Sequence, residues 1–133
     1  MRTKFSISLV AFFLIAPVGF AQQIPMPQAS PSARIIQKVG LTDVTVDYSR
    51  PSTKGRKIFG ELVPFGEVWR TGANGATILT FSTEVSIAGT KVPAGSYALY
   101  SIPGKREWKL ILSKNTNLWG SIGYSADDDL LRF

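Results

Sequence analysis

The residues best suited to bind a ligand lie between two predicted strands, in the long segment from Tyr48 to Asn74. This segment combines basic side chains with aromatic residues, prolines and glycines. Guanidinium groups can hold a carboxylate or a phosphate through two parallel hydrogen bonds, and an aromatic ring offers a flat apolar face to a sugar or another planar group. We therefore predict a pocket for a small anionic or glycan ligand, formed by Tyr48, Arg50, Lys54, Arg56, Trp69, Arg70 and Asn74.

A structural explanation of the same segment is open at this point. Its basic side chains could pair with Asp47, Glu61 and Glu67 and so hold a long loop in place, because long ordered loops need such ties as often as they bind ligands. Adjacent residues on a strand point to opposite faces, so we expect Trp69 in the core and Arg70 at the pocket. Without a pocket, the chain would be a purely structural domain.

The end of the segment also has two interpretations. Residues 71–74 offer backbone N–H groups and a side-chain amide, which could form an anion-binding concavity. Alternatively, Asn74 and Gly75 form a simple turn in the left-handed conformation. We expect the turn.

The sequence contains no histidine and no cysteine. This excludes Ser-His-Asp and Cys-His catalysis and the common zinc sites. Glu61 and Glu67 could still act as the acid–base pair of an envelope hydrolase, which is the alternative function. Residues 127–129 are three aspartates, but they lack the glycine and the distal glutamate of a known calcium loop. We therefore expect a solvated acidic turn there, and we predict no catalytic residue, no metal and no cofactor.

The first 21 residues have the pattern of a secretory signal peptide. Arg2 and Lys4 precede an apolar run from Phe5 to Val18, and small residues follow at a cleavage site that ends at Ala21. The run is shorter than the roughly 20 residues of a transmembrane helix. We expect cleavage near Ala21, a periplasmic or secreted location, and no stable membrane anchor.

The expected mature chain is only mildly basic. Without Arg2 and Lys4 it keeps 13 basic and 9 acidic residues, a net charge of +4. No basic cluster belongs to a recognised nucleic-acid module, so we expect no nucleic-acid partner. A small anionic or glycan ligand, or an envelope protein, is the partner that this composition favours. Residues 22–32 are rich in proline and small residues, and they predict an extended linker.

Alternating apolar residues predict about seven short strands. Turn residues recur at regular spacing, including Gly89-Thr90, and Ile58–Leu62 is long enough for one helical turn only. This pattern is typical of an antiparallel β-sandwich, and we expect Tyr97, Trp108 and Trp119 in its core or at the rim. The predicted strands lie at residues 34–39, 43–49, 76–82, 84–88, 96–102, 108–113 and 130–133.

Several uncommon blocks of sequence occur in a fixed order: YSRPSTKGRKIFGELVPFGEVWRTGAN, ATILTFSTEV, KVPAGSYALYSIPGKREW and NLWG. With these blocks the chain resembles the bacterial family known as domain of unknown function 2911, from about Ser32 onward. The resemblance implies an exported or periplasmic protein with an all-β domain and no established activity.

The chain departs from this family at two points. The family usually has glutamate where this chain has Gly75, which puts in doubt any activity that uses that carboxylate. The family domain also continues beyond Phe133, where this chain stops at the start of a predicted strand. We therefore expect the β-sandwich domain at residues 33–133 to be incomplete at its C-terminal end, with an exposed sheet edge.

Overall fold

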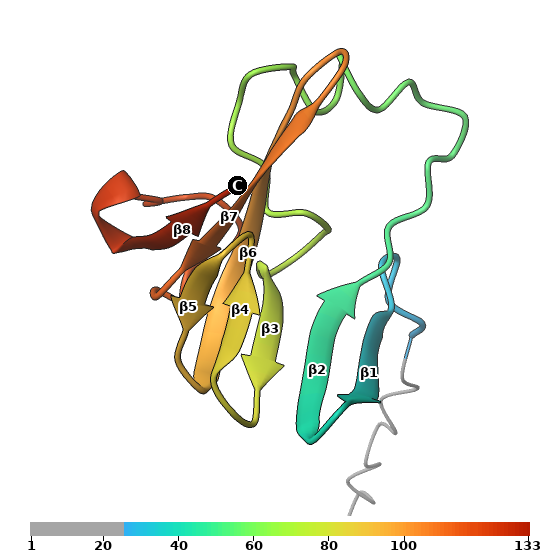
Figure 1. The fold of residues 1–133 in the computed structure, drawn as a ribbon. Coiled ribbons are helices and arrows are strands. Elements are labelled where there is room, and N and C mark those ends of the chain that lie inside the picture. The colour runs from blue at the N-terminus through green and yellow to red at the C-terminus, as the bar shows by residue number, and fades with distance from the viewer. Residues whose placement is uncertain (1–25) are drawn as a thin grey trace, which may run out of the picture.

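The structure, a computed structural model, describes residues 26–133. The predicted signal peptide at residues 1–21 lies outside the described residues, as do residues 22–25 of the predicted linker. The described part contains eight strands and one short 3-10 turn (Figure 1). They are β1 (Ser32–Val39), β2 (Thr42–Ser49), β3 (Thr77–Phe81), β4 (Val85–Ile87), β5 (Thr90–Val92), β6 (Gly95–Pro103), β7 (Trp108–Ser113), η1 (Ala126–Asp128) and β8 (Asp129–Arg132).

Six of these strands form one antiparallel sheet in the order β1-β2-β3-β6-β7-β8, while β4 and β5 form a separate hairpin. The hairpin lies across one face of the sheet in Figure 1. The predicted antiparallel, sandwich-like all-β fold is confirmed, with the hairpin as its smaller layer. No helix within residues 26–133 is long and apolar enough to cross a membrane.

The first core cluster fills the space between the sheet and the hairpin. Val92 of β5 is fully buried there and packs with Phe81 of β3, Tyr97 of β6 and Leu112 of β7. The Tyr97 hydroxyl donates a hydrogen bond to the carbonyl oxygen of Pro93 at 2.9 Å, so this buried phenol has its polar atom satisfied. Tyr97 therefore lies in the core, as the strand pattern predicts.

The second core cluster lies on the opposite face of the sheet, because side chains alternate along each strand. It contains Ala98 and Tyr100 of β6 and Ile111 of β7. The long connection contributes Val68 to it, and the segment after β7 contributes Tyr124, whose ring lies 5.0 Å from that of Tyr100. The segment predicted to hold the site is therefore also part of the structural core.

Some local predictions are wrong. Residues 90–92 form a strand of their own, and the tight turn before them lies at Ala88-Gly89, where φ is 49° and 79°, instead of at Gly89-Thr90. Residues 58–62 form hydrogen-bonded turns and not a helical turn. Trp119 is 68% exposed and belongs to neither core cluster, whereas Trp108 lies at the rim.

The last strand, β8, pairs with β7 along its outer edge. Leu131 lies opposite Leu112, and a bulge between Leu112 and Ser113 shifts the register. Phe133 continues the ladder, because its backbone N–H and carbonyl groups both bond to Leu110, at 3.0 and 2.7 Å. Within the described residues, the sheet therefore ends at β1 on one side and at β8 on the other.

Candidate functional site

The connection between β2 and β3, residues 50–76, forms most of the wall of a cavity of about 710 Å³. Ser30, before β1, and Ser121, after β7, complete the wall. Four of the seven residues that we predicted to bind a ligand line this cavity, and they are Arg56, Trp69, Arg70 and Asn74. Tyr48, Arg50 and Lys54 lie outside its lining.

Two backbone attachments hold the connection against β6. Trp69 and Ser101 exchange hydrogen bonds of 2.8 and 2.9 Å, and the Gly66 N–H donates to the Pro103 carbonyl at 2.9 Å. The Thr71 hydroxyl donates to the Ser101 hydroxyl at 2.9 Å, which fixes the chain beyond Trp69. Residues 68–70 are therefore held like a short additional strand at the edge of β6.

Arg70 follows this attachment and is half-buried. Its Nε atom is buried and has no hydrogen-bond partner among the described residues, and its guanidinium forms no ion pair there. The side chain lies against Gly120: a Cβ atom at that position would come within 2.7 Å of the Arg70 Nη1 atom. Gly120 also has φ = +70°, a conformation that disfavours other residues. Gly120 thus makes the space that Arg70 occupies at the cavity wall.

Arg56 contributes to the cavity in a different way. Its Nε and Nη2 atoms donate to the carbonyl oxygens of Thr53 and Ser52, each at 3.0 Å. These bonds close the turn at Lys54-Gly55. Part of the Arg56 hydrogen-bonding capacity is therefore used by the loop itself.

The alternative set of ion pairs does not form as the sequence suggested. Asp47 pairs with Arg34 of β1, and Glu61 pairs with Lys57 at 3.1 Å. Glu67 forms no ion pair with a described residue. The loop is held by backbone contacts and by packing, and not by the ion pairs that the sequence suggested for Arg50, Lys54, Arg56 and Arg70.

Trp69 is not in the core, so this prediction is wrong. Its ring forms edge-to-face contacts with Phe59 at 5.7 Å and with Trp108 at 6.2 Å, and Phe59 and Trp108 are 4.8 Å apart. The reason is its position along β6: Trp69 pairs with Ser101, beyond the part of the strand that packs against the hairpin. The three rings form a separate aromatic cluster, and two of them, Trp69 and Phe59, line the cavity.

Asn74 has the predicted left-handed conformation, with φ = 61°, but Gly75 does not share it. Its side-chain amide donates to the Ser30 carbonyl at 3.3 Å and to the Ser49 hydroxyl at 3.2 Å. Asn74 therefore ties the connection to the residues just before β1 and at the end of β2, which lie together at the open end of the hairpin. Both amide hydrogens are used in these bonds, so Asn74 can offer a ligand only its oxygen atom.

Tyr48 lies apart from the cavity, in a shallow hollow of about 200 Å³ that it shares with Gly75. A Cβ atom at Gly75 would meet nothing within 4 Å. The glutamate that the resemblance implies at this position would therefore fit sterically. Gly75 lines the hollow and not the cavity, so this glutamate would be attached outside the cavity wall.

The two carboxylates of the alternative function are placed differently. Glu67 lines the cavity, whereas Glu61 lies outside the lining, is bonded to Lys57 and is 58% exposed. Glycoside hydrolysis by an acid–base pair requires two carboxyl groups on either side of one substrate bond. The structure brings only Glu67 of this pair to the cavity.

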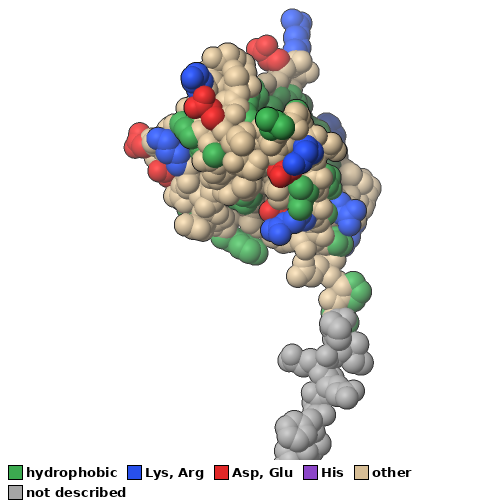
Figure 2. All heavy atoms as spheres, turned by 60° about the horizontal axis from the view of Figure 1, so that its bottom comes forward, with side chains coloured by type: hydrophobic (Ala, Val, Ile, Leu, Met, Phe, Trp, Pro, Cys, Tyr) green, Lys and Arg blue, Asp and Glu red, His purple; other side chains and the backbone are tan. Residues whose placement is uncertain are grey.

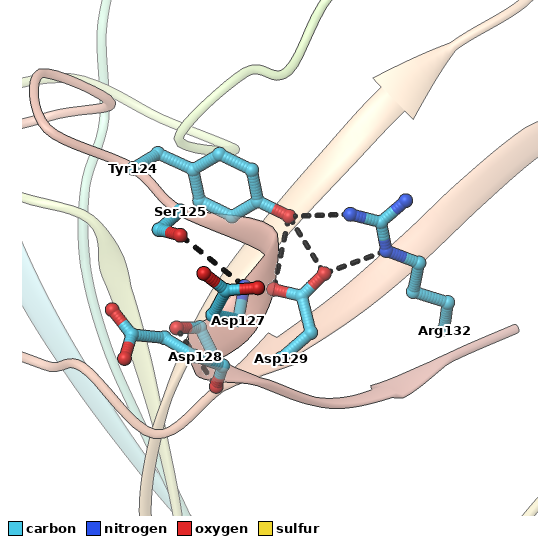
Figure 3. A network of polar contacts seen from close by, with 7 residues as sticks. Tyr124, Ser125, Asp127, Asp128, Asp129 and Arg132 are labelled. Carbon is cyan, nitrogen blue, oxygen red and sulfur yellow. Dashed lines mark hydrogen bonds and ion pairs between the residues drawn. The ribbon is translucent and has the colours of Figure 1, made fainter.

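The solvated turn that we expected at the C-terminal aspartates holds for Asp127, which is exposed, but not for Asp129. Figure 3 shows Asp129 facing the Tyr124 hydroxyl and the Arg132 guanidinium, at 2.7 and 2.6 Å. The Asp129 side chain is only 7% exposed. Burial and the bond to Asp129 raise the pKa of Tyr124. No group of three or more acidic residues in the described part could hold a metal ion.

Sequence reasoning missed Ser30 and Ser121 as residues of the cavity wall, and Gly120 as the residue that the Arg70 side chain lies against. Gly120 and Ser121 come from the segment after β7, and only folding brings them to this site. The glycine that ends the block NLWG, Gly120, was an available signal, since glycine is the usual residue where another group closely approaches the backbone.

Comparison with known proteins gives one match. The model of a family described as "Protein of unknown function (DUF2911)" matches residues 30–133. Neither a curated protein nor a solved structure matches the chain. The matched range contains the whole sheet, the hairpin and the cavity.

Proposed function

The chain belongs to the DUF2911 family, whose function is unknown, and from the cavity of this member we propose that it is a ligand-binding module and not an enzyme. The ligand is a small molecule with one carboxylate or phosphate group attached to a flat or apolar part, such as an acidic sugar. The anionic group binds Arg70, and the rest of the ligand lies against Trp69 and Phe59. The predicted signal peptide supports an envelope or extracellular location.

The observation that carries this proposal is the environment of Arg70. A charged group that is partly removed from water needs a counter-charge or hydrogen-bond partners, because burying it alone is costly. The buried Nε atom of Arg70 has no such partner among the described residues. An anion in the cavity would supply one, through the bidentate geometry that guanidinium favours.

The charge of the surrounding segments supports the same ligand class. Residues 50–70 contain five basic side chains and two acidic ones. The cavity itself is lined by two of these basic residues, Arg56 and Arg70, and by one of the acidic ones, Glu67. An excess of one sign of charge raises the local concentration of ligands of the opposite sign. This favours an anionic ligand over a neutral one.

A thermal-shift titration tests the proposal. We expect inorganic phosphate, glucose 6-phosphate or glucuronate to raise the Tm of the purified protein, and neutral glucose to do so less or not at all, because a ligand that binds only the folded state stabilises it. In Arg70→Gln we expect binding to weaken roughly tenfold or more, since hydrogen bonds to charged groups contribute about 1.5–3 kcal/mol.

Arg50→Gln is the matched control. Arg50 is exposed, lies in the same connection and is outside the cavity lining, so its removal changes the net charge equally and should leave the Tm shift intact. If no anion shifts the Tm, or if both variants lose the shift to the same extent, the cavity is not the anion site.

A further inference from the structure

The basic side chains of this protein are concentrated at one end of the molecule. In Figure 1 the connection between β2 and β3 lies beside the turn between β6 and β7, and the bond from Gly66 to Pro103 joins them. We call residues 50–70 and 104–109 the basic end. It holds eight basic residues, Arg50, Lys54, Arg56, Lys57, Arg70, Lys105, Arg106 and Lys109, against three acidic ones, Glu61, Glu67 and Glu107.

The charge balance elsewhere is different. The remaining described residues include five basic and six acidic side chains. Four of these five basic residues are ion-paired, namely Arg34, Lys38, Lys91 and Arg132. Figure 2, which brings the bottom of the Figure 1 view forward, shows acidic and basic side chains next to one another on that face. In the basic end, by contrast, only Lys57 forms an ion pair with a described residue.

An apolar patch lies within the basic end. It consists of Phe59, Leu62, Phe65 and Trp108, which are 39%, 55%, 39% and 41% exposed. Phe59 contacts Trp108 at 4.8 Å. The Phe65 ring lies over Gly60, where a Cβ atom would come within 2.6 Å of it, and Gly60 has φ = +85°. Glycine at position 60 therefore leaves room for the Phe65 ring beside the turn that follows Phe59.

We propose that the apolar patch and the basic residues near it in the chain, Lys57, Lys105 and Arg106, dock this protein on an anionic phospholipid surface. Trp108 has one polar edge and is suited to the boundary between lipid headgroups and acyl chains, and the other three side chains of the patch add apolar surface beside it. Lysine and arginine next to them can keep their stems on apolar surface and their charges at the phosphate groups. The proposal does not depend on a ligand in the cavity.

A lipid surface fits these residues better than a protein partner does. Protein–protein interfaces are depleted in lysine, whereas two of the three basic residues near the patch are lysines. Lysine near an anionic membrane is favourable without a specific partner, because the attraction comes from the surface potential as a whole. Lys105 and Arg106 form no ion pair with a described residue, which leaves their charges available for it.

Vesicle co-sedimentation tests this inference. We expect the purified protein to bind vesicles of phosphatidylcholine mixed with phosphatidylglycerol and not vesicles of phosphatidylcholine alone, with weaker binding at high salt. Each basic residue near such a surface contributes roughly fivefold in affinity. The double variant Lys105→Gln, Arg106→Gln should therefore bind about 30-fold more weakly, whereas Lys91→Gln, Lys114→Gln, which removes two charges outside the basic end, should bind almost unchanged.

A second pair of variants tests the apolar patch. Leu62→Ser should weaken vesicle binding, and Ile122→Ser, which changes an even more exposed side chain outside the patch, should not. Brominated lipids should quench tryptophan fluorescence in the wild type and in Trp119→Phe, but much less in Trp108→Phe. The last variant keeps an aromatic ring beside Phe59, so the fold is preserved.

Three outcomes would overturn the inference: no vesicle binding, equal binding to neutral vesicles, or undiminished binding of the Lys105→Gln, Arg106→Gln variant. The same double variant should keep its thermal shift with glucose 6-phosphate, because neither residue lines the cavity. Failure of vesicle binding and failure of ligand binding are thus observed separately.

Discussion

The Tyr124 hydroxyl lies between the carboxylate of Asp129 and the guanidinium of Arg132. It donates a hydrogen bond to the Asp129 carboxylate and accepts one from the Arg132 Nη2 atom at 2.9 Å. Burial raises the pKa of Tyr124 above its ordinary value of 10.0, and the hydrogen bond to Asp129 raises it further. The neutral phenol is therefore the form that the folded protein stabilises.

This shift predicts a loss of stability at alkaline pH. Between the unfolded and the folded pKa of Tyr124, the folded state binds more protons than the unfolded state does, so the free energy of unfolding decreases as pH rises. The contribution of the neutral Tyr124 side chain to the free energy of unfolding is complete below about pH 10, the unfolded pKa. It is lost as pH increases through the folded pKa. Urea unfolding followed by tryptophan fluorescence, from pH 8 to pH 11, measures it.

Tyr124→Phe provides the comparison. It should be less stable than the wild type at pH 8, because Asp129 and Arg132 lose their shared partner, and the difference should shrink as pH rises. The pKa of Tyr100 is also raised, mainly by burial. Because Tyr100 is present in both proteins, its effect on the pH dependence of stability cancels in the comparison. Parallel stability curves would show that Tyr124 does not titrate differently in the two states.

At the level of elements, the predictable part of this fold is the part built on alternation. The strand β7 was predicted with its observed bounds, because Leu110 and Leu112 alternate with Lys109 and Ile111 between clear turns. The strand β5 was missed, since it has only three residues and only Val92 of them is buried. Strands of this length are defined by the partner across a tight turn, and not by their own pattern.

The candidate site was predictable in outline only. The types of residue in the connection indicated a basic and aromatic cavity wall, and Arg56, Trp69 and Arg70 do line one cavity. The contact of Arg70 with Gly120 and the inward orientation of Asp129 were not predictable, because each depends on a pairing between distant or bulged segments. Composition shows which chemistry is available, but tertiary contacts decide which side chain is buried.

The β4–β5 hairpin offers a test of how the two layers are held together. Val92 is fully buried in the first core cluster. We expect Val92→Ala to lower the free energy of unfolding by about 2 kcal/mol, from the lost burial of two methyl groups and the remaining cavity. Val39→Ala in β1, where the side chain is 61% exposed, should change it by less than about 0.5 kcal/mol.

Chemical denaturation of both variants measures this difference. An equal and small effect of the two substitutions would mean that the hairpin does not form part of the cooperative core. In that case the six-stranded sheet alone would account for the stability of the fold.

For the molecule as a whole, burial is distributed unevenly across the sheet. The central strands β6 and β7 contain fully buried residues on both faces, such as Tyr100, Ile111 and Leu112. The edge strand β1 contains no buried residue. It contacts the rest of the sheet through β2 alone, apart from the bonds that the connection makes at Ser30 and Pro31.

This distribution predicts two classes of backbone amide in hydrogen exchange. Amides of β6 and β7 should exchange only through global unfolding, whereas those of β1 should exchange faster, through local opening of the edge.

The variant Val92→Ala distinguishes these two classes of amide. Its loss of about 2 kcal/mol should reduce the protection of β6 and β7 amides roughly 30-fold and leave that of β1 almost unchanged. If β1 amides are as protected as those of β7 and respond equally, the β1–β2 hairpin unfolds together with the core, and the bonds of Asn74 to Ser30 and Ser49 are strong enough to couple them.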